Sequence, residues 1–198
     1  MSTRISFESA FRDFLDSQPI SIGYQDNSAS FTDLDFFLQI GDESFALELK
    51  EKKQKYNLLK WEGIHIPEEH LMLIDELSVR KIVLSGASSG LLITDSVRDK
   101  LFFFSMIDLV LMPHLKRFNR LTRFREKEGV KGKWAIDLRH GLECRDLGAA
   151  LKAIKAYQHV IPTLKEAASC INVYHGETIT GGGTTRTMDY LNKDVAEK

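Results

Sequence analysis

The chain has few of the features that mark secreted, disulfide-bonded or membrane-spanning proteins. Its 198 residues include two cysteines, Cys144 and Cys170, which form neither a disulfide framework nor a metal-spaced cluster. It contains no run of about 18 apolar residues, so no membrane span is expected. The segment from Met1 to Phe14 lacks a continuous apolar core, so no secretory signal is expected either. We therefore expect a cytoplasmic protein in a reducing compartment.

Several enzyme signatures are also missing. The six histidines are scattered, and the glycine-rich segment from Gly86 to Gly90 has neither the lysine nor the spacing of a phosphate-binding loop. We therefore expect no zinc, nucleotide or Ser-His-Asp site. The net charge of −1 gives no overall support for nucleic-acid binding, so the distribution of charge matters more than its sum.

Residues 31–53 carry the strongest functional signal, because they resemble two short strands joined by a turn at 41–44. Side chains on a strand alternate between its two faces. The alternation predicts an apolar face with Leu34, Phe36, Leu38, Ile40, Phe45, Leu47 and Leu49, and an opposite face with Asp33, Asp35, Phe37, Gln39, Ala46, Glu48 and Lys50. If Asp42 and Glu43 form the loop, Asp35 lies opposite Lys50 and diagonal to Glu48.

Two carboxylates and an ammonium on one face suit a magnesium site beside a phosphodiester. Magnesium prefers oxygen ligands, which Asp35, Glu48 and the backbone carbonyl of Leu49 can supply. The cation lowers the pKa of a bound water and offsets charge on the phosphate, while Lys50 is placed to orient the water and neutralise a phosphate oxygen. A solvent-facing hairpin with alternating charges gives the same letters, and that alternative stays open here.

The order Asp35, then Glu48-x-Lys50, resembles the PD-(D/E)xK nuclease superfamily, with Leu34 in the place of the usual proline. The order of elements over residues 5–112 is most similar to Holliday-junction resolvases of the Hjc and RecU types. The resemblance implies an α/β fold with a central mixed sheet flanked by helices, as in restriction endonucleases. It implies a nuclease-like domain over residues 1–175, followed by a C-terminal extension over 176–198 that the glycine- and threonine-rich segment 178–187 indicates is a flexible tail.

The function implied by the resemblance is a Mg²⁺-dependent endodeoxyribonuclease, with Mn²⁺ as a substitute, acting on branched DNA in recombination and repair. Two cuts on opposed strands need two sites, so we expect a homodimer. A restriction or defence nuclease that cuts linear duplex, and a nucleic-acid-binding module without catalysis, remain alternatives. By the same resemblance, Glu8 on an amphipathic helix over residues 6–16 approaches the metal; an exposed Glu8 paired with Arg12 is the other interpretation.

Two basic segments are candidates for DNA contact. Residues 116–133 contain eight basic residues against Glu126 and Glu128, and a second run follows the Glu48-x-Lys50 motif. Phosphate backbones attract such segments by counterion release, although a solvated loop or helix face has the same composition. The residues expected to bind DNA are Lys52, Lys53, Lys55, Lys116, Arg117, Arg120, Arg123 and Arg125.

Hydrophobic periodicity and turn residues predict the remaining elements. We expect helices over 67–77, 105–111 and 146–160, the last ending near Pro162, and strands over 20–24, 81–85, 91–94, 101–104 and 134–138. The alternation of helices and strands favours an α/β layered fold.

Overall fold

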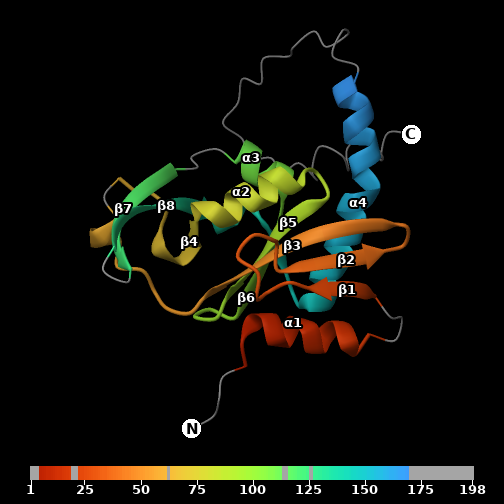
Figure 1. Ribbon diagram of the computed structural model, residues 1–198, viewed down its shortest axis with the longest axis horizontal. Helices are drawn as coiled ribbons and strands as arrows, with labels where there is room; N and C mark the ends of the chain where they lie inside the picture. Colours follow the sequence, from red (N-terminus) through yellow and green to blue (C-terminus); the bar gives the residue numbers. More distant parts are fainter. Residues whose placement is uncertain (1–4, 19–21, 62, 113–115, 125–126, 170–198) are drawn as a thin grey trace.

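The computed structural model describes residues 5–18, 22–61, 63–112, 116–124 and 127–169 (Figure 1). Its centre is a six-stranded mixed sheet with the order β1-β2-β3-β5-β6-β9. The strands are β1 (Gly23–Asp26), β2 (Phe36–Ile40), β3 (Glu43–Lys52), β5 (Ser89–Asp95), β6 (Lys100–Ser105) and β9 (Leu142–Cys144). β3 and β5 are parallel, whereas the other neighbours are antiparallel.

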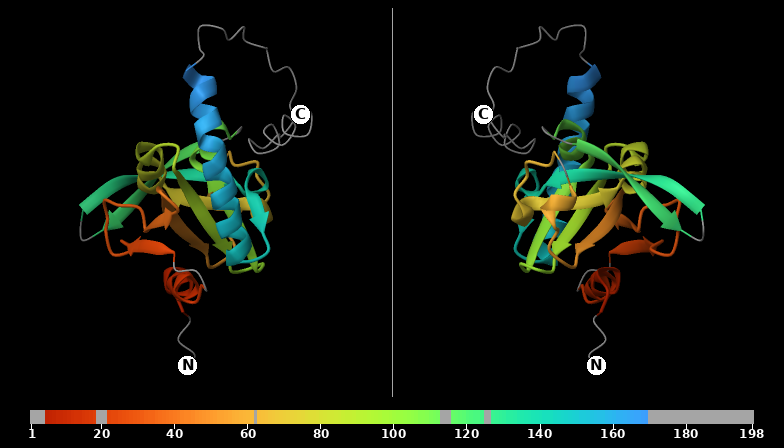
Figure 2. Two further views of the ribbon diagram at one scale, coloured as in Figure 1. Left: turned by 90° about the vertical axis from the view of Figure 1, so that its right-hand side faces the viewer. Right: turned by 90° about the vertical axis from the view of Figure 1, so that its left-hand side faces the viewer.

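Helices cover both faces of this sheet (Figures 1 and 2). Helices α1 (Phe7–Asp16) and α4 (Leu147–Ser169) pack on one face, over a core that includes Phe45 and Leu47. Helices α2 (Glu76–Ser85) and α3 (Met106–Leu111) pack on the other, over Leu91 and Ile93. The mixed α/β architecture expected from the sequence is confirmed.

A second, three-stranded sheet lies beside α2. Its strands are β4 (Leu71–Asp75), β8 (Lys127–Asp137) and β7 (Lys116–Phe124), antiparallel in that order. Three short 3-10 turns complete the described elements: η1 (Leu58–Lys60), η2 (Glu68–His70) and η3 (Leu138–His140). Within the described residues, no helix has the length and apolar character needed to span a bilayer.

Helix α1 begins where Ser6 accepts a hydrogen bond from the Ser9 N–H at 3.1 Å, an N-cap that satisfies one of the free amides of the first turn. Phe7, Phe11 and Leu15 recur every four residues and are buried, because this spacing puts them on one side of a helix. The predicted helix over 6–16 is therefore confirmed, and it packs on the α1/α4 face of the sheet.

The β2–β3 hairpin has the predicted faces on β3 but a different register. Phe45, Leu47 and Leu49 belong to the core under α1 and α4, while Ala46 belongs to the core under α2. The pairing runs from Phe36 opposite Leu47 to Ile40 opposite Glu43, so the loop is Gly41-Asp42 and not Asp42-Glu43. Gly41 takes a positive φ of 64°, which glycine adopts without a steric cost. The shift is an even number of residues, so each side chain keeps its face.

The strand predicted over the start of the hairpin is shorter than expected. β2 begins at Phe36, and Leu34 packs with Ala46 in the core under α2 instead of sharing the face of Phe36. The alternation therefore ends before Asp35, which lies in a bend that leads into the strand.

Three other predictions were wrong. Residues 71–75 form β4, not a helix, because Leu71 and Leu73 face one core and Met72 and Ile74 another; a strand buried on both sides has a continuous apolar run. Residues 81–85 are helical and belong to α2, which buries Ser78, Val79 and Ile82. Helix α4 continues past Pro162, where the buried Ile161 holds it on the core.

The remaining strand and helix predictions agree with the structure where it is described. The segments 91–94, 101–104 and 134–137 lie in β5, β6 and β8, and 106–111 forms α3 behind a capping box at Ser105. Gly23 and Tyr24 of the predicted strand 20–24 lie in β1. The boundary expected at 175 and the tail 176–198 lie outside the described residues.

Candidate active site

Asp35 is fixed at the point where β2 stops pairing with β3. The last paired residue of β2 is Phe36, opposite Leu47, so the next amide of β3 on that edge has no strand partner. The Leu49 N–H instead donates a 2.7 Å hydrogen bond to Oδ2 of Asp35. The pairing of β2 with β3 therefore defines the position of this carboxylate, and the Asp35 side chain is 11% exposed.

Glu48 extends from β3 toward α2 and is 1% exposed. Its Oε1 accepts hydrogen bonds from the hydroxyl of Ser78 and the ammonium of Lys50, each at 2.7 Å. Its Oε2 lies 3.0 Å from Nζ of Lys81. A buried carboxylate needs such partners, since an isolated buried charge is very costly.

Lys50 connects the two carboxylates and reaches solvent. Its Nζ donates to the Leu49 carbonyl at 3.0 Å, besides the bond to Glu48, and lies 3.8 Å from Oδ2 of Asp35. The side chain is 29% exposed. It is therefore the most solvent-accessible member of the group.

The electrostatics of the group favour an added cation. Burial and the neighbouring charge of Glu48 raise the pKa of Asp35, while the Leu49 N–H, Lys50 and Lys81 act in the opposite direction. Two carboxylates that share a site repel each other and disfavour joint ionisation. A divalent ion between them would relieve that repulsion.

The residues present fit a hard divalent cation. Asp35, Glu48 and the Leu49 carbonyl offer only oxygen donors, which is the set that magnesium prefers. Oε2 of Glu48 is buried and accepts no hydrogen bond from the described residues, although it is ion-paired with Lys81. The described residues contain no group of three or more His, Cys, Asp or Glu side chains that could hold a metal, so water would have to complete the coordination, as is usual for magnesium.

Glu8 does not join Asp35 and Glu48, so this expectation is not met. All three carboxylates lie in the described part of the chain, which contains no group of three or more His, Cys, Asp or Glu side chains that could hold a metal ion. The three carboxylates therefore do not converge. The reason is the position of α1, which packs with Phe7 and Phe11 on the face opposite to the one Glu48 occupies.

Lys52 was expected to bind DNA, and the structure contradicts this. Its side chain is fully buried and its Nζ lies 2.9 Å from Oε1 of Glu68 and 3.7 Å from Oδ2 of Asp95. By contrast, Lys53 and Lys55 are exposed, and Lys53 pairs with Glu51 at 3.3 Å. Of the basic run after the motif, these two remain available to a ligand.

Four of the other residues expected to bind DNA belong to the second sheet. Lys116, Arg117, Arg120 and Arg123 lie on β7, and Arg125 lies outside the described residues. The basic segment thus forms strands β7 and β8, and not the loop or helix face considered from the sequence.

Sequence reasoning missed Ser78 and Lys81, both on α2. They lie three residues apart and therefore on one side of the helix, where both contact Glu48. Lys81 also donates to the carbonyl of Asp33 at 2.6 Å, which ties α2 to the segment that carries Asp35. The signal was hidden because residues 81–85 were predicted to be a strand.

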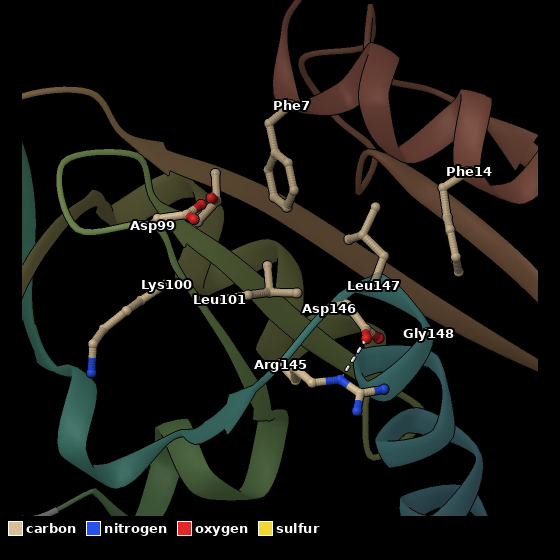
Figure 3. Close-up of a pocket in the computed structure, with 10 residues that line it drawn as sticks. Phe7, Phe14, Asp99, Lys100, Leu101, Arg145, Asp146, Leu147 and Gly148 are labelled. Carbon is tan, nitrogen blue, oxygen red and sulfur yellow. Dashed lines mark hydrogen bonds and ion pairs between the residues drawn. The ribbon is translucent and has the colours of Figure 1, made fainter.

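A pocket on the other face of the sheet is unrelated to this site (Figure 3). It lies between α1, the β5–β6 turn and the start of α4, and is lined in part by Phe7, Leu101 and Leu147. One of its two carboxylates, Asp146, pairs with Arg145 at 2.9 Å and accepts the Ala149 N–H at 2.7 Å, and the other, Asp99, lies in the β5–β6 turn. These contacts cap α4, so we assign the pocket no chemistry.

Comparisons with known proteins find solved structures of nucleases. No protein-family model and no curated protein sequence match the chain. Hjc, a Holliday junction resolvase from the archaeal hyperthermophile Archaeoglobus fulgidus, is 18% identical over 70% of this chain and 92% of its own, with a TM-score of 0.39. A nuclease from a fusselovirus is 8% identical over 76% of this chain and 83% of its own, with a TM-score of 0.40. Both TM-scores are below 0.5.

Proposed function

We propose that the chain is a metal-dependent DNA endonuclease that hydrolyses phosphodiester bonds. The observation that carries the proposal is the convergence of Asp35, Glu48, the Leu49 carbonyl and Lys50 at the end of the β2–β3 pairing. Two acids, a backbone oxygen and an ammonium make a site that can hold a divalent cation beside a phosphate.

Each residue has a defined task in this proposal. Asp35, Glu48 and the Leu49 carbonyl would hold Mg²⁺, for which Mn²⁺ could substitute. When bound, the cation would supply an acidic water and offset charge on the phosphate. Lys50, the more exposed of the two lysines on Glu48, orients the attacking water and neutralises a phosphate oxygen. Ser78 and Lys81 hold the Glu48 carboxylate in place from α2.

The finer function is the structure-directed cleavage of branched DNA, as in Holliday junction resolution during recombination and repair. Coordinated cuts on two strands need two active sites, so the working form is a homodimer. DNA is held by the exposed Lys53 and Lys55 and by the basic strands of the second sheet, because phosphates bind such residues with counterion release.

The proposal is tested with substitutions that keep the shape of each carboxylate. Asp35→Asn and Glu48→Gln are each expected to lower Mg²⁺-dependent cleavage of a four-way junction on the order of 10²- to 10³-fold, the usual loss when one charge-stabilising group is removed. Asp33→Asn is the matched control, because this carboxylate is exposed and bonds to Ser30 and Thr32. Cleavage that persists unchanged in both site variants would overturn the proposal.

Two further assays separate the alternatives. Discrete bands from linear duplex, with no preference for the junction, would favour a restriction or defence nuclease. Salt-sensitive DNA binding without cleavage in Mg²⁺ or Mn²⁺ would favour a binding module.

A further inference from the structure

Phe31 is a phenylalanine that the fold keeps in solvent. It is 88% exposed, whereas every other phenylalanine whose side chain the structure describes is buried or half-buried. It belongs to none of the three hydrophobic cores found among the described residues. Leu34, in the same segment, is 1% exposed and packs in the core under α2. One exposed apolar side chain is ordinary on a protein surface, so the argument depends on the turn that carries Phe31 and on what that turn contacts.

The turn around Phe31 is held by its own hydrogen bonds. The hydroxyl of Ser30 accepts the N–H groups of Thr32 and Asp33, each at 3.2 Å, and donates to Oδ2 of Asp33 at 2.7 Å. The Ser30 N–H donates to the Asn27 carbonyl at 2.7 Å. Hydrogen bonds from serine and aspartate side chains to nearby backbone groups fix the conformation of a turn. The turn is therefore ordered without help from the ring of Phe31, which stays in solvent.

The same turn is tied directly to the candidate active site. The Asn27 N–H donates to the carbonyl of Asp35 at 2.8 Å, and Nζ of Lys81 donates to the carbonyl of Asp33 at 2.6 Å. Phe31 lies four residues before Asp35, which is at most about 14 Å of extended chain. Successive bases of one DNA strand are about 3.4 Å apart. The ring can therefore contact only bases that lie a few steps from a phosphate held at Asp35.

The face of an aromatic ring is suited to bind the face of a nucleobase. This stacking tolerates any sequence, because every base has a π-face. In B-form duplex the bases stack on one another and present only their edges in the grooves. A base face becomes available where the stack is interrupted, as at a branch point, and apolar side chains can hold such a step open by inserting between bases. An exposed ring beside the site therefore recognises DNA structure and not sequence.

We propose that Phe31 stacks on a nucleobase exposed at an interruption of the duplex beside the bond that is cut, and so gives the site its preference for branched DNA. The inference rests on the proposed function, which places a phosphate at Asp35, and it assigns the choice of substrate to one side chain. Leu59 provides the matched control. It is similarly exposed, at 94%, but lies on η1 and has no ring that can stack.

The test compares the binding of a four-way DNA junction with that of a linear duplex of the same sequence, measured by fluorescence anisotropy in EDTA. Phe31→Ala is expected to lower the affinity for the junction about tenfold, the usual loss when one stacking aromatic is removed, and to leave the affinity for the duplex unchanged. Phe31→Tyr keeps the ring and should bind both DNAs as the wild type does. Phe31→Leu keeps an apolar side chain without the ring and should resemble Phe31→Ala. Leu59→Ala should change neither affinity.

A fluorescent base reports the contact itself. The emission of 2-aminopurine placed at the branch point should change when the wild type or Phe31→Tyr binds, because stacking alters its fluorescence, and should change less with Phe31→Ala or Phe31→Leu. The same base inside one arm of the junction should respond alike to all four proteins. Since Phe31 is exposed, the variants should keep the thermal midpoint of the wild type, which excludes unfolding as the cause of weaker binding.

Several results would overturn the proposal. Equal losses of affinity for junction and duplex in Phe31→Ala would show that the side chain does not recognise an interruption of the stack. Junction binding by Phe31→Leu at the level of the wild type would show that the ring is not needed. A wild type that binds the two DNAs equally well, or a loss in Leu59→Ala as large as that in Phe31→Ala, would also contradict it.

The result also separates this inference from the proposed function. A wild-type protein that cleaves nothing in Mg²⁺ or Mn²⁺, but loses its preference for the junction in Phe31→Ala, would remove the nuclease proposal and leave Phe31 as a base-stacking residue. Cleavage by the wild type, with an unchanged preference for the junction in Phe31→Ala, would do the reverse.

Discussion

Two groups of buried and partly buried charges lie along β3, and their lysines on that strand are only two residues apart. The site cluster consists of Asp35, Glu48, Lys50 and Lys81. The clamp cluster consists of Lys52, Glu68, Asp95 and Arg98. Each combines two acids with two bases, but the surroundings of the carboxylates differ.

The clamp cluster holds its charges in a stable arrangement. Besides its ion pairs, Lys52 donates to the Glu68 carbonyl at 2.7 Å and lies 5.0 Å from the centre of the Tyr56 ring. Arg98 contacts the same two acids, Glu68 at 2.5 Å and Asp95 at 3.0 Å. Burial acts to raise the pKa of Glu68, but the Tyr56 N–H, Lys52 and Arg98 outweigh it and lower the pKa to about 2.

The site cluster has the opposite balance. Burial and Glu48 outweigh the Leu49 N–H and the two lysines, so the pKa of Asp35 is raised. A carboxylate with a raised pKa next to a second carboxylate is typical of groups that take up a proton or a cation as part of their work. The comparison teaches that similar sets of charges on neighbouring residues can leave one carboxylate with a lowered pKa and another with a raised one, which is the state that the proposed function uses.

The largest effect expected from this comparison is on stability. Lys52→Met is expected to lower the free energy of unfolding by about 3 kcal/mol, the lower end for a buried ion pair that loses one partner, because Arg98 still neutralises Glu68 and Asp95. Urea denaturation measures the loss as a lower midpoint with an unchanged slope.

Lys50→Met is the matched control for Lys52→Met. It removes the same group two residues away, but from a partly exposed position. It should cost clearly less stability and should lower cleavage strongly. An equal loss of stability in the two variants would contradict the distinction between the clusters.

The sequence predicted the part of the site cluster that depends on local periodicity. Alternation along β3 placed Glu48 and Lys50 on one face and Phe45, Leu47 and Leu49 on the other, and this is confirmed. The register was wrong because Gly41, and not Asp42, begins the loop. The predicted register differs from the observed one by two residues, so each side chain keeps its face. The prediction that Glu48 and Lys50 share a face was therefore unaffected.

Partners that are distant in sequence could not be predicted in this way. In the sequence, Lys52 belongs to a run of basic residues that resembles a surface segment. Its partners Glu68 and Asp95 come from the η2 turn and from β5, and local sequence does not reveal them. Lys81 was missed because a short apolar run does not distinguish a strand from a buried helix segment, and α2 was needed to bring it to Glu48.

An effect of intermediate size is expected in acid. The pKa of Glu68 is lowered from 4.5 to about 2 by folding, so its contribution to stability is complete above pH 4.5 and is lost as the pH falls from 4.5 toward 2. Glu68→Gln removes this titration and should flatten the dependence of the unfolding free energy on pH in that range. Urea denaturation at a series of pH values measures both proteins, and parallel curves would show that Glu68 is not the group that titrates.

The smallest effect concerns Lys81, whose charge helps to lower the pKa of Asp35 against burial and Glu48. Lys81→Met is expected to raise that pKa further, so that Asp35 ionises, and Mg²⁺ binds, only at higher pH than in the wild type. Carbon NMR of the Asp35 carboxyl in the metal-free protein measures the titration, and Mg²⁺ titrations at several pH values measure its consequence. Lys155→Met, on the exposed side of α4, should leave both unchanged. The opposite result would be an unchanged pKa of Asp35 in Lys81→Met together with tighter Mg²⁺ binding. Lys81 would then act mainly by competing with the cation for Glu48, and not by lowering the pKa of Asp35.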